Sequence, residues 1–190
     1  MASKVDICNL ALSKLGTDRI ISLTDNTVSA KECNFRYDLI AEFTMSAGSW
    51  PSCVKRASLA QLTDTPTYGF DYAYQLPTDP RCLRVLAINE LKLGDTDYSI
   101  EDGKLLSNET TMDILYIAFI TDPGSYDTYL TQAIVENLAA DMAFKFTGSI
   151  DTAQKMQEYA NKKMMELLNM AGCQGSGEVI PSDSYTDIRK

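Results

Sequence analysis

Carboxylates are the side chains in this sequence that could most readily do chemistry. Three pairs lie close together along the chain: Asp71 with Asp79, Asp95 with Asp97, and Glu101 with Asp102. A glycosidase needs two carboxylates flanking a cleft, one of them in an apolar pocket that raises its pKa. All three pairs fall in segments rich in turn-forming residues, where Asp commonly bonds to the nearby backbone. Turn formation is therefore the simpler interpretation, and glycoside hydrolysis stays open as an alternative.

Histidine is absent from all 190 residues. Ser-His-Asp and Cys-His catalysis therefore lack their base, and His-containing zinc, iron and copper sites lack a ligand. The sequence also contains no P-loop, G-x-S-x-G, G-x-G-x-x-G or EF-hand spacing. We expect no catalytic residues, no metal site and no cofactor.

The five cysteines are scattered and show no C-x-x-C spacing; they are Cys8, Cys33, Cys53, Cys82 and Cys173. Cys8, Cys33 and Cys82 lie in apolar runs, which predicts small buried side chains in a reducing compartment. A disulfide framework or a metal site is the weaker interpretation.

Acidic side chains outnumber basic ones, with 26 Asp and Glu against 17 Lys and Arg and a formal net charge of −9. This balance argues against attraction to nucleic-acid phosphates, although it suits a wall past which DNA slides without sticking. The amphipathic N-terminus does not resemble a signal peptide, and no apolar run approaches the roughly 18 residues of a membrane span. We expect a soluble protein without membrane contact, made in the cytosol.

Helices are predicted where apolar side chains recur at helical spacing, over residues 3–15, 27–47, 51–62, 125–147 and from Asp151 to Gly172. Asp151 and Gln154 resemble a capping box at the start of the last helix. Few residues join the last two helices, so these should pack as a long antiparallel hairpin. The sequence thus predicts a helical bundle made of residues 1–62 and 121–172.

Residues 63–120 have a different character. The stretch 63–81 carries three prolines, one glycine and three tyrosines, which is typical of loop or extended chain. Strands are predicted over residues 82–92, 98–100, 104–106 and 112–120. Asp102-Gly103 is the signal of a type I′ hairpin turn. The fold class is therefore α+β, mainly α, with a small antiparallel sheet of three or four strands inserted between helices.

Aromatic side chains alternate along the loop at Tyr68, Phe70, Tyr72 and Tyr74. In an extended chain their rings would project to one side. Two interpretations remain open: the rings pack on the protein's own sheet, or they contact a neighbouring subunit, where Tyr is enriched. These four residues and Trp50 are the candidate subunit-interface residues.

The last segment, residues 173–190, has no helical period and contains Gly-Ser-Gly near its start. It is predicted to be an extended C-terminal tail. Four of its side chains are too apolar for an inert linker: Val179, Ile180, Tyr185 and Ile188. This pattern favours docking to a partner, with a frayed terminus as the alternative.

Several runs of the sequence together resemble a known family. They are Asn9-Leu10-Ala11-Leu12 with Leu15-Gly16, then Ala30, Cys33 and Tyr37-Asp38, then Trp50, Arg56 and Leu59-Ala60, then Tyr72-Ala73-Tyr74-Gln75-Leu76-Pro77, Asp79 and Cys82-Leu83-Arg84-Val85. On these runs the chain resembles the tail tubular protein A, or head-to-tail adaptor, family of tailed bacteriophages. The resemblance covers residues 5–170, and its most specific part is the run from Tyr72 to Val85.

The resemblance implies a structural virion protein without enzymatic activity. Family members form a ring, commonly of twelve copies, at the head–tail junction between the portal protein and the downstream tail protein. The ring extends the DNA channel and helps to retain and eject the genome, and DNA passes through it without sequence-specific binding. The C-terminal segment often grips the portal, which makes Val179, Ile180, Tyr185 and Ile188 candidate portal-binding residues. A generic acidic protein-binding module is the alternative, and a cell-wall glycosidase is a more distant one.

Overall fold

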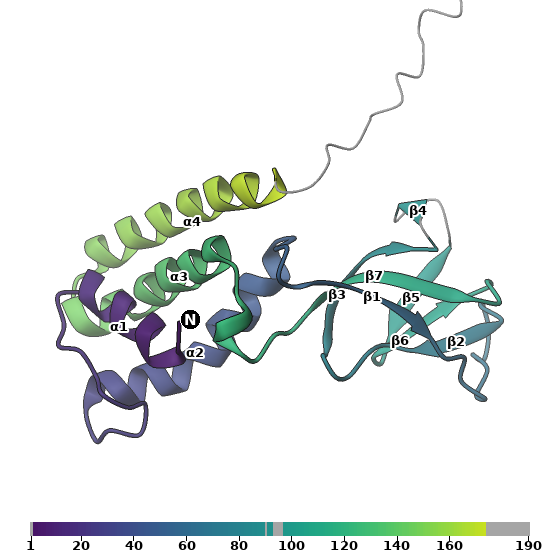
Figure 1. The fold of residues 1–190 in the computed structure, drawn as a ribbon, viewed down its shortest axis with the longest axis horizontal. Coiled ribbons are helices and arrows are strands. Elements are labelled where there is room, and N and C mark those ends of the chain that lie inside the picture. Colours follow the sequence, from purple (N-terminus) through teal and green to yellow (C-terminus); the bar gives the residue numbers. More distant parts are fainter. Residues whose placement is uncertain (1, 90, 93–96, 174–190) are drawn as a thin grey trace, which may run out of the picture.

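The computed structural model describes residues 2–89, 91–92 and 97–173, and these form a helical lobe and a β lobe that lie side by side (Figure 1). The chain passes from the helical lobe to the β lobe after α2, and it returns to the helical lobe before α3. The predicted class, α+β and mainly α, is confirmed. None of the described helices is both long and apolar enough to cross a membrane.

The helical lobe contains the predicted long helices, which are α1 (Lys4–Lys14), α2 (Val28–Ala47), α3 (Thr128–Thr147) and α4 (Ile150–Gly172), with a short 3-10 turn η1 (Pro123–Ser125) before α3. Ser3 begins α1 as a capping box with Asp6, and Thr27 caps α2. Gly148 ends α3 with a φ of 65°, a left-handed conformation that favours glycine. The N-terminal cap of α4 differs from the prediction. The Ser149 side chain, rather than that of Asp151, accepts the hydrogen bond from the backbone N–H of Thr152.

The predicted helix over residues 51–62 is wrong. A turn follows Trp50, and residues 54–59 form strand β1, which pairs antiparallel with β7 from Val54 opposite Ile117 to Leu59 opposite Met112. Its side chains alternate between half-buried and exposed over most of its length. Pairing with a distant strand overrides local helical propensity here, so the β lobe begins about ten residues before the predicted boundary.

The β lobe holds two antiparallel sheets where the sequence predicted one. The first has the strand order β1-β7-β3-β4 and the second the order β2-β6-β5. Beyond β1 (Val54–Leu59), the strands are β2 (Tyr72–Gln75), β3 (Cys82–Ile88), β4 (Leu91–Lys92), β5 (Tyr98–Glu101), β6 (Lys104–Ser107) and β7 (Met112–Ala118). The predicted hairpin turn is confirmed, because Asp102 and Gly103 have φ values of 50° and 70° between β5 and β6.

Each lobe has its own apolar core. In the helical lobe α3 contacts the other three helices, and its buried side chains lie on almost every side of the helix. Trp50 is fully buried at the edge of this core, where its Nε1 donates to the carbonyl of Thr44 over 2.8 Å. The core of the β lobe is built around Tyr74, Leu105 and Ile114. Each lobe is thus stabilised by a core of its own. Within the helical lobe α3 is central, and α2 and α4 pack around it.

Candidate functional site

Helix α2 carries apolar side chains on two faces. One face, with Cys33, Tyr37 and Met45 fully or almost fully buried, packs into the core. On the other face Phe35, Leu39 and Phe43 are 77%, 69% and 58% exposed. Their four-residue spacing aligns them as one ridge along the helix, the arrangement that packs into the groove of another helix. We call these three residues the α2 ridge.

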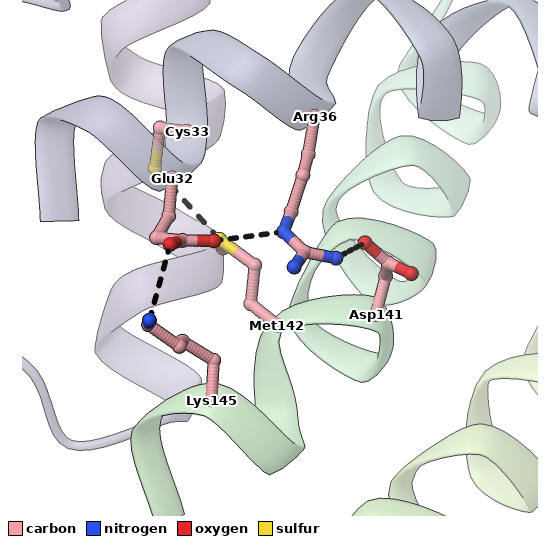
Figure 2. A network of polar contacts seen from close by, with 6 residues as sticks. All are labelled: Glu32, Cys33, Arg36, Asp141, Met142 and Lys145. Carbon is pink, nitrogen blue, oxygen red and sulfur yellow. Dashed lines mark hydrogen bonds and ion pairs between the residues drawn. The ribbon is translucent and has the colours of Figure 1, made fainter. Parts of the chain in front are cut away.

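Ion pairs fix the helix that bears the ridge against α3 (Figure 2). Arg36 bonds through Nε to Glu32 over 3.0 Å and through Nη1 to Asp141 over 2.5 Å, and Lys145 lies 3.5 Å from Glu32. The hydrogen bond from Arg36 lowers the pKa of the Glu32 carboxyl, and the bond to Asp141 raises the pKa of the Arg36 guanidinium. The four charges therefore hold α2 in a defined position while its ridge faces solvent.

Sulfur atoms lie beneath this network. The Cys33 Sγ donates to the Met142 Sδ over 4.0 Å (Figure 2), and hydrogen bonding with Cys33 together with burial raises the pKa of the Cys8 thiol. Cys8, Cys33 and Cys53 are buried, Cys82 is half-buried, and Cys173 is exposed at the end of α4. The prediction of small buried thiols is confirmed for Cys8 and Cys33. In the described part of the chain, no three Cys, Asp or Glu side chains are placed to hold a metal ion.

The predicted row of aromatic rings does not form one surface. Trp50 and Tyr74 are buried, and the Tyr74 hydroxyl donates to the carbonyl of Glu109 over 2.5 Å. Tyr72 packs half-buried on the core of the β lobe. β2 pairs with β6, which turns the rings of Tyr72 and Tyr74 onto the protein's own sheet. Trp50 lies outside β2 and packs into the core of the helical lobe. Trp50 and Tyr74 are therefore corrected from interface residues to internal packing residues, and the half-buried Tyr72 stays a prediction.

Tyr68 and Phe70 keep a surface position in the loop before β2. Tyr68 is 88% exposed, and both rings line a hollow of about 340 Å³ that also reaches the β5–β6 turn. The carboxylates of Asp64, Glu101 and Asp102 border the same hollow, and all three residues are exposed. Exposed positions differ from the apolar pocket in which a glycosidase's general acid lies. Of the other sequence pairs, Asp71 and Asp79 are exposed, and Asp95 lies outside the described residues.

A second apolar surface lies on the helical lobe, at the α3–α4 turn. Phe144 and Ile150, which are 55% and 65% exposed, line a shallow groove of about 440 Å³ between these helices. Ala140 and Ala153 contribute small side chains to the same groove. This surface is concave, whereas the α2 ridge is convex.

Sequence reasoning missed the α2 ridge, although a signal for it was present. Phe35, Leu39 and Phe43 repeat at four-residue intervals, offset by two residues from the buried positions Cys33 and Tyr37. A helix with two such stripes has one more apolar face than its own core can cover. The candidate tail residues, Val179, Ile180, Tyr185 and Ile188, lie outside the described residues.

Comparison with protein-family models and with curated proteins gives no match.

Proposed function

We propose that the protein is a structural component of a phage virion, a head-to-tail adaptor that forms a ring between the portal protein and the downstream tail protein. The α2 ridge is the observation that carries this proposal. Three large apolar side chains face solvent on a helix fixed by ion pairs, and such patches on soluble proteins mark binding surfaces. A protein partner is the occupant that this surface favours.

A ring requires two different faces on each subunit, because each copy contacts one neighbour with one face and the other neighbour with another. The helical lobe offers a convex ridge on α2 and a concave groove lined by Phe144 and Ile150. Tyr68 on the β lobe adds an exposed ring of the type enriched at interfaces. These surfaces support a heterologous assembly. The expectation of twelve copies comes from the family resemblance alone.

The charge of the chain agrees with a channel through which DNA moves. A net charge of −9 repels phosphates, so a ring of such subunits would pass DNA without holding it. In this proposal the protein acts in the virion without a cofactor, after synthesis in the host cytoplasm. Its partners are the portal and the downstream tail protein, and it does not contact a membrane.

Electron microscopy of the full chain mixed with the portal protein of the same phage tests this function. We expect a ring stacked on the portal. The Leu39→Asp variant should lose the ring, because it places a charge in the middle of the α2 ridge. Ile21→Asp is the matched control, since Ile21 is 92% exposed and lies outside the ridge. The absence of co-assembly by the unaltered protein would contradict the proposed function.

A further inference from the structure

The exposed face of α2 carries a longer apolar row than the α2 ridge alone. Val28, the first residue of the helix, is 61% exposed and lies two turns before Phe35 on the same face. The interval of seven residues between Val28 and Phe35 is the repeat that keeps side chains in line along two packed helices. This face of α2, on one outer side of the helical lobe (Figure 1), therefore has the pattern of a helix that packs lengthwise against another helix.

Two side chains of opposite charge flank this apolar row. Lys31 is exposed, and the Glu42 side chain is 44% exposed, with its Oε2 bonded to Arg81 over 2.7 Å. Eleven residues along a helix are close to three full turns, so Lys31 and Glu42 lie on the same flank of the row, about 16 Å apart along the helix axis. This flank thus has a basic group toward the start of α2 and an acidic group toward its end.

The pattern is complementary to itself when two α2 helices lie antiparallel. The midpoint between Lys31 and Glu42 falls within one residue of the midpoint between Phe35 and Leu39. A two-fold axis at this point sets Lys31 opposite Glu42 of a second copy. The same axis sets Phe35 opposite Leu39 of the second copy. A parallel pair would instead set Lys31 opposite Lys31 and Glu42 opposite Glu42, an arrangement that like charges oppose.

Other charges beside this face are already paired within the chain. Asp38, on the same flank as Lys31, bonds to Lys4 over 2.6 Å. On the other flank Glu32 and Arg36 bond to each other over 3.0 Å. Two copies can therefore approach along α2 without burying these charges unpaired, although each chain carries a net charge of −9.

We propose that two free copies of the protein pair through α2, antiparallel about a two-fold axis, with Lys31 bound to Glu42 of the second copy and the α2 ridge covered. One helix from each copy makes the contact, which places the buried area below the roughly 1,200 Å² at which stable specific interfaces begin. The dimer is therefore reversible, with a dissociation constant in the micromolar range. A ring neighbour can then replace the second copy on the ridge. This last consequence rests on the proposed function, whereas the pairing itself does not.

Sedimentation equilibrium of the full chain without the portal protein tests the pairing. Lys31→Glu and Glu42→Lys should each raise the dissociation constant of the dimer about tenfold, because each sets like charges against each other at both ends of the symmetric contact. An equal mixture of the two variants should regain a dimer, since opposite charges then meet at both ends. Lys162→Glu and Glu158→Lys are the matched controls, because both residues are exposed on α4, and the dimer should not change.

Three results would overturn the pairing. The first is a monomeric unaltered chain at about 500 µM, where a micromolar dimer is almost fully formed. The second is a mixture of Lys31→Glu and Glu42→Lys that associates no better than either variant alone. The third is an equal loss of dimer in the α4 controls. Ring formation on the portal is a separate measurement: a ring with a monomeric free chain removes only the pairing, and a dimer without a ring removes only the proposed function.

Discussion

The side chain of Leu168 fills the space above the backbone of Gly48, so that a Cβ on Gly48 would lie 2.1 Å from Leu168 Cδ2 and 3.1 Å from the ring of Trp50. This contact joins the end of α2 to α4. Gly48→Ala should therefore lower the free energy of unfolding by about 1–3 kcal/mol, because the half-buried Leu168 must move from its place against the core. Urea unfolding followed by circular dichroism measures this change.

Gly172→Ala is the control for that substitution. Gly172 ends α4, and an added Cβ would meet no atom of the described structure within 4 Å. Replacing this glycine restricts the unfolded chain without creating a clash, so stability should stay the same or rise by up to about 1 kcal/mol. Equal destabilisation by both substitutions would show that the Leu168 contact does not cause the loss.

Two buried tyrosines should respond in opposite directions to loss of the hydroxyl. The Tyr74 hydroxyl donates to the carbonyl of Glu109, whereas the buried Tyr37 hydroxyl has no hydrogen-bond partner among the described residues. Tyr74→Phe should cost about 1 kcal/mol, because a carbonyl loses its donor. Tyr37→Phe should be neutral or stabilising, because it removes a polar atom from an apolar site. A larger loss for Tyr37→Phe than for Tyr74→Phe in denaturant unfolding would contradict this assignment.

The long helices could be predicted from the sequence because their signals are local. Ser3 and Thr27 cap α1 and α2 where the pattern begins, and Gly148 ends α3 with positive φ. The Asp102-Gly103 turn is equally local, since both residues adopt the φ that a type I′ turn requires. Such features depend on a few neighbouring residues and need no knowledge of the rest of the fold.

Features that depend on distant partners could not be predicted in the same way. β1 forms a strand because it pairs with β7, more than fifty residues away along the chain. β2 forms a strand because it pairs with β6. Likewise, the sequence predicts an extended segment around Tyr74, but the side that its ring faces is decided by pairing with β6. The α2 ridge became recognisable once Cys33 and Tyr37 had been shown to fill the core-facing side.

The ion pairs around Arg36 make stability depend on pH. Hydrogen bonding to Arg36 holds the folded-state pKa of Glu32 below its usual 4.5. A carboxyl whose pKa is lower in the folded state than in the unfolded state stabilises the fold at pH values above its unfolded-state pKa. This stabilisation is lost as the pH falls through the folded-state pKa. Glu32→Gln should therefore cost about 1 kcal/mol at neutral pH, and the difference from the unaltered protein should shrink below pH 4.5.

Urea unfolding of both proteins between neutral pH and about pH 3 checks this dependence. Glu158→Gln serves as the control, because Glu158 is an exposed carboxylate on α4, a helix that carries none of the four charges around Arg36. A gap between Glu32→Gln and the unaltered protein that stays constant across this range would show that Glu32 acts through packing and not through its charge.

The two faces of α2 should separate folding from association. Met45 is fully buried on one face, so Met45→Ser removes apolar contacts and should cost about 2–5 kcal/mol. Leu39 is 69% exposed on the other face, and Leu39→Ser should change the free energy of unfolding by at most about 1 kcal/mol.

Ring formation on the portal should show the reverse order of effects, with the larger loss for the Leu39 variant, when it is measured at a temperature where both variants are folded. Leu39→Ser should abolish it and Met45→Ser should retain it, because of the two only Leu39 belongs to the surface that a neighbour covers in the proposed ring. A ring that forms normally with Leu39→Ser would place the subunit contact elsewhere on the molecule.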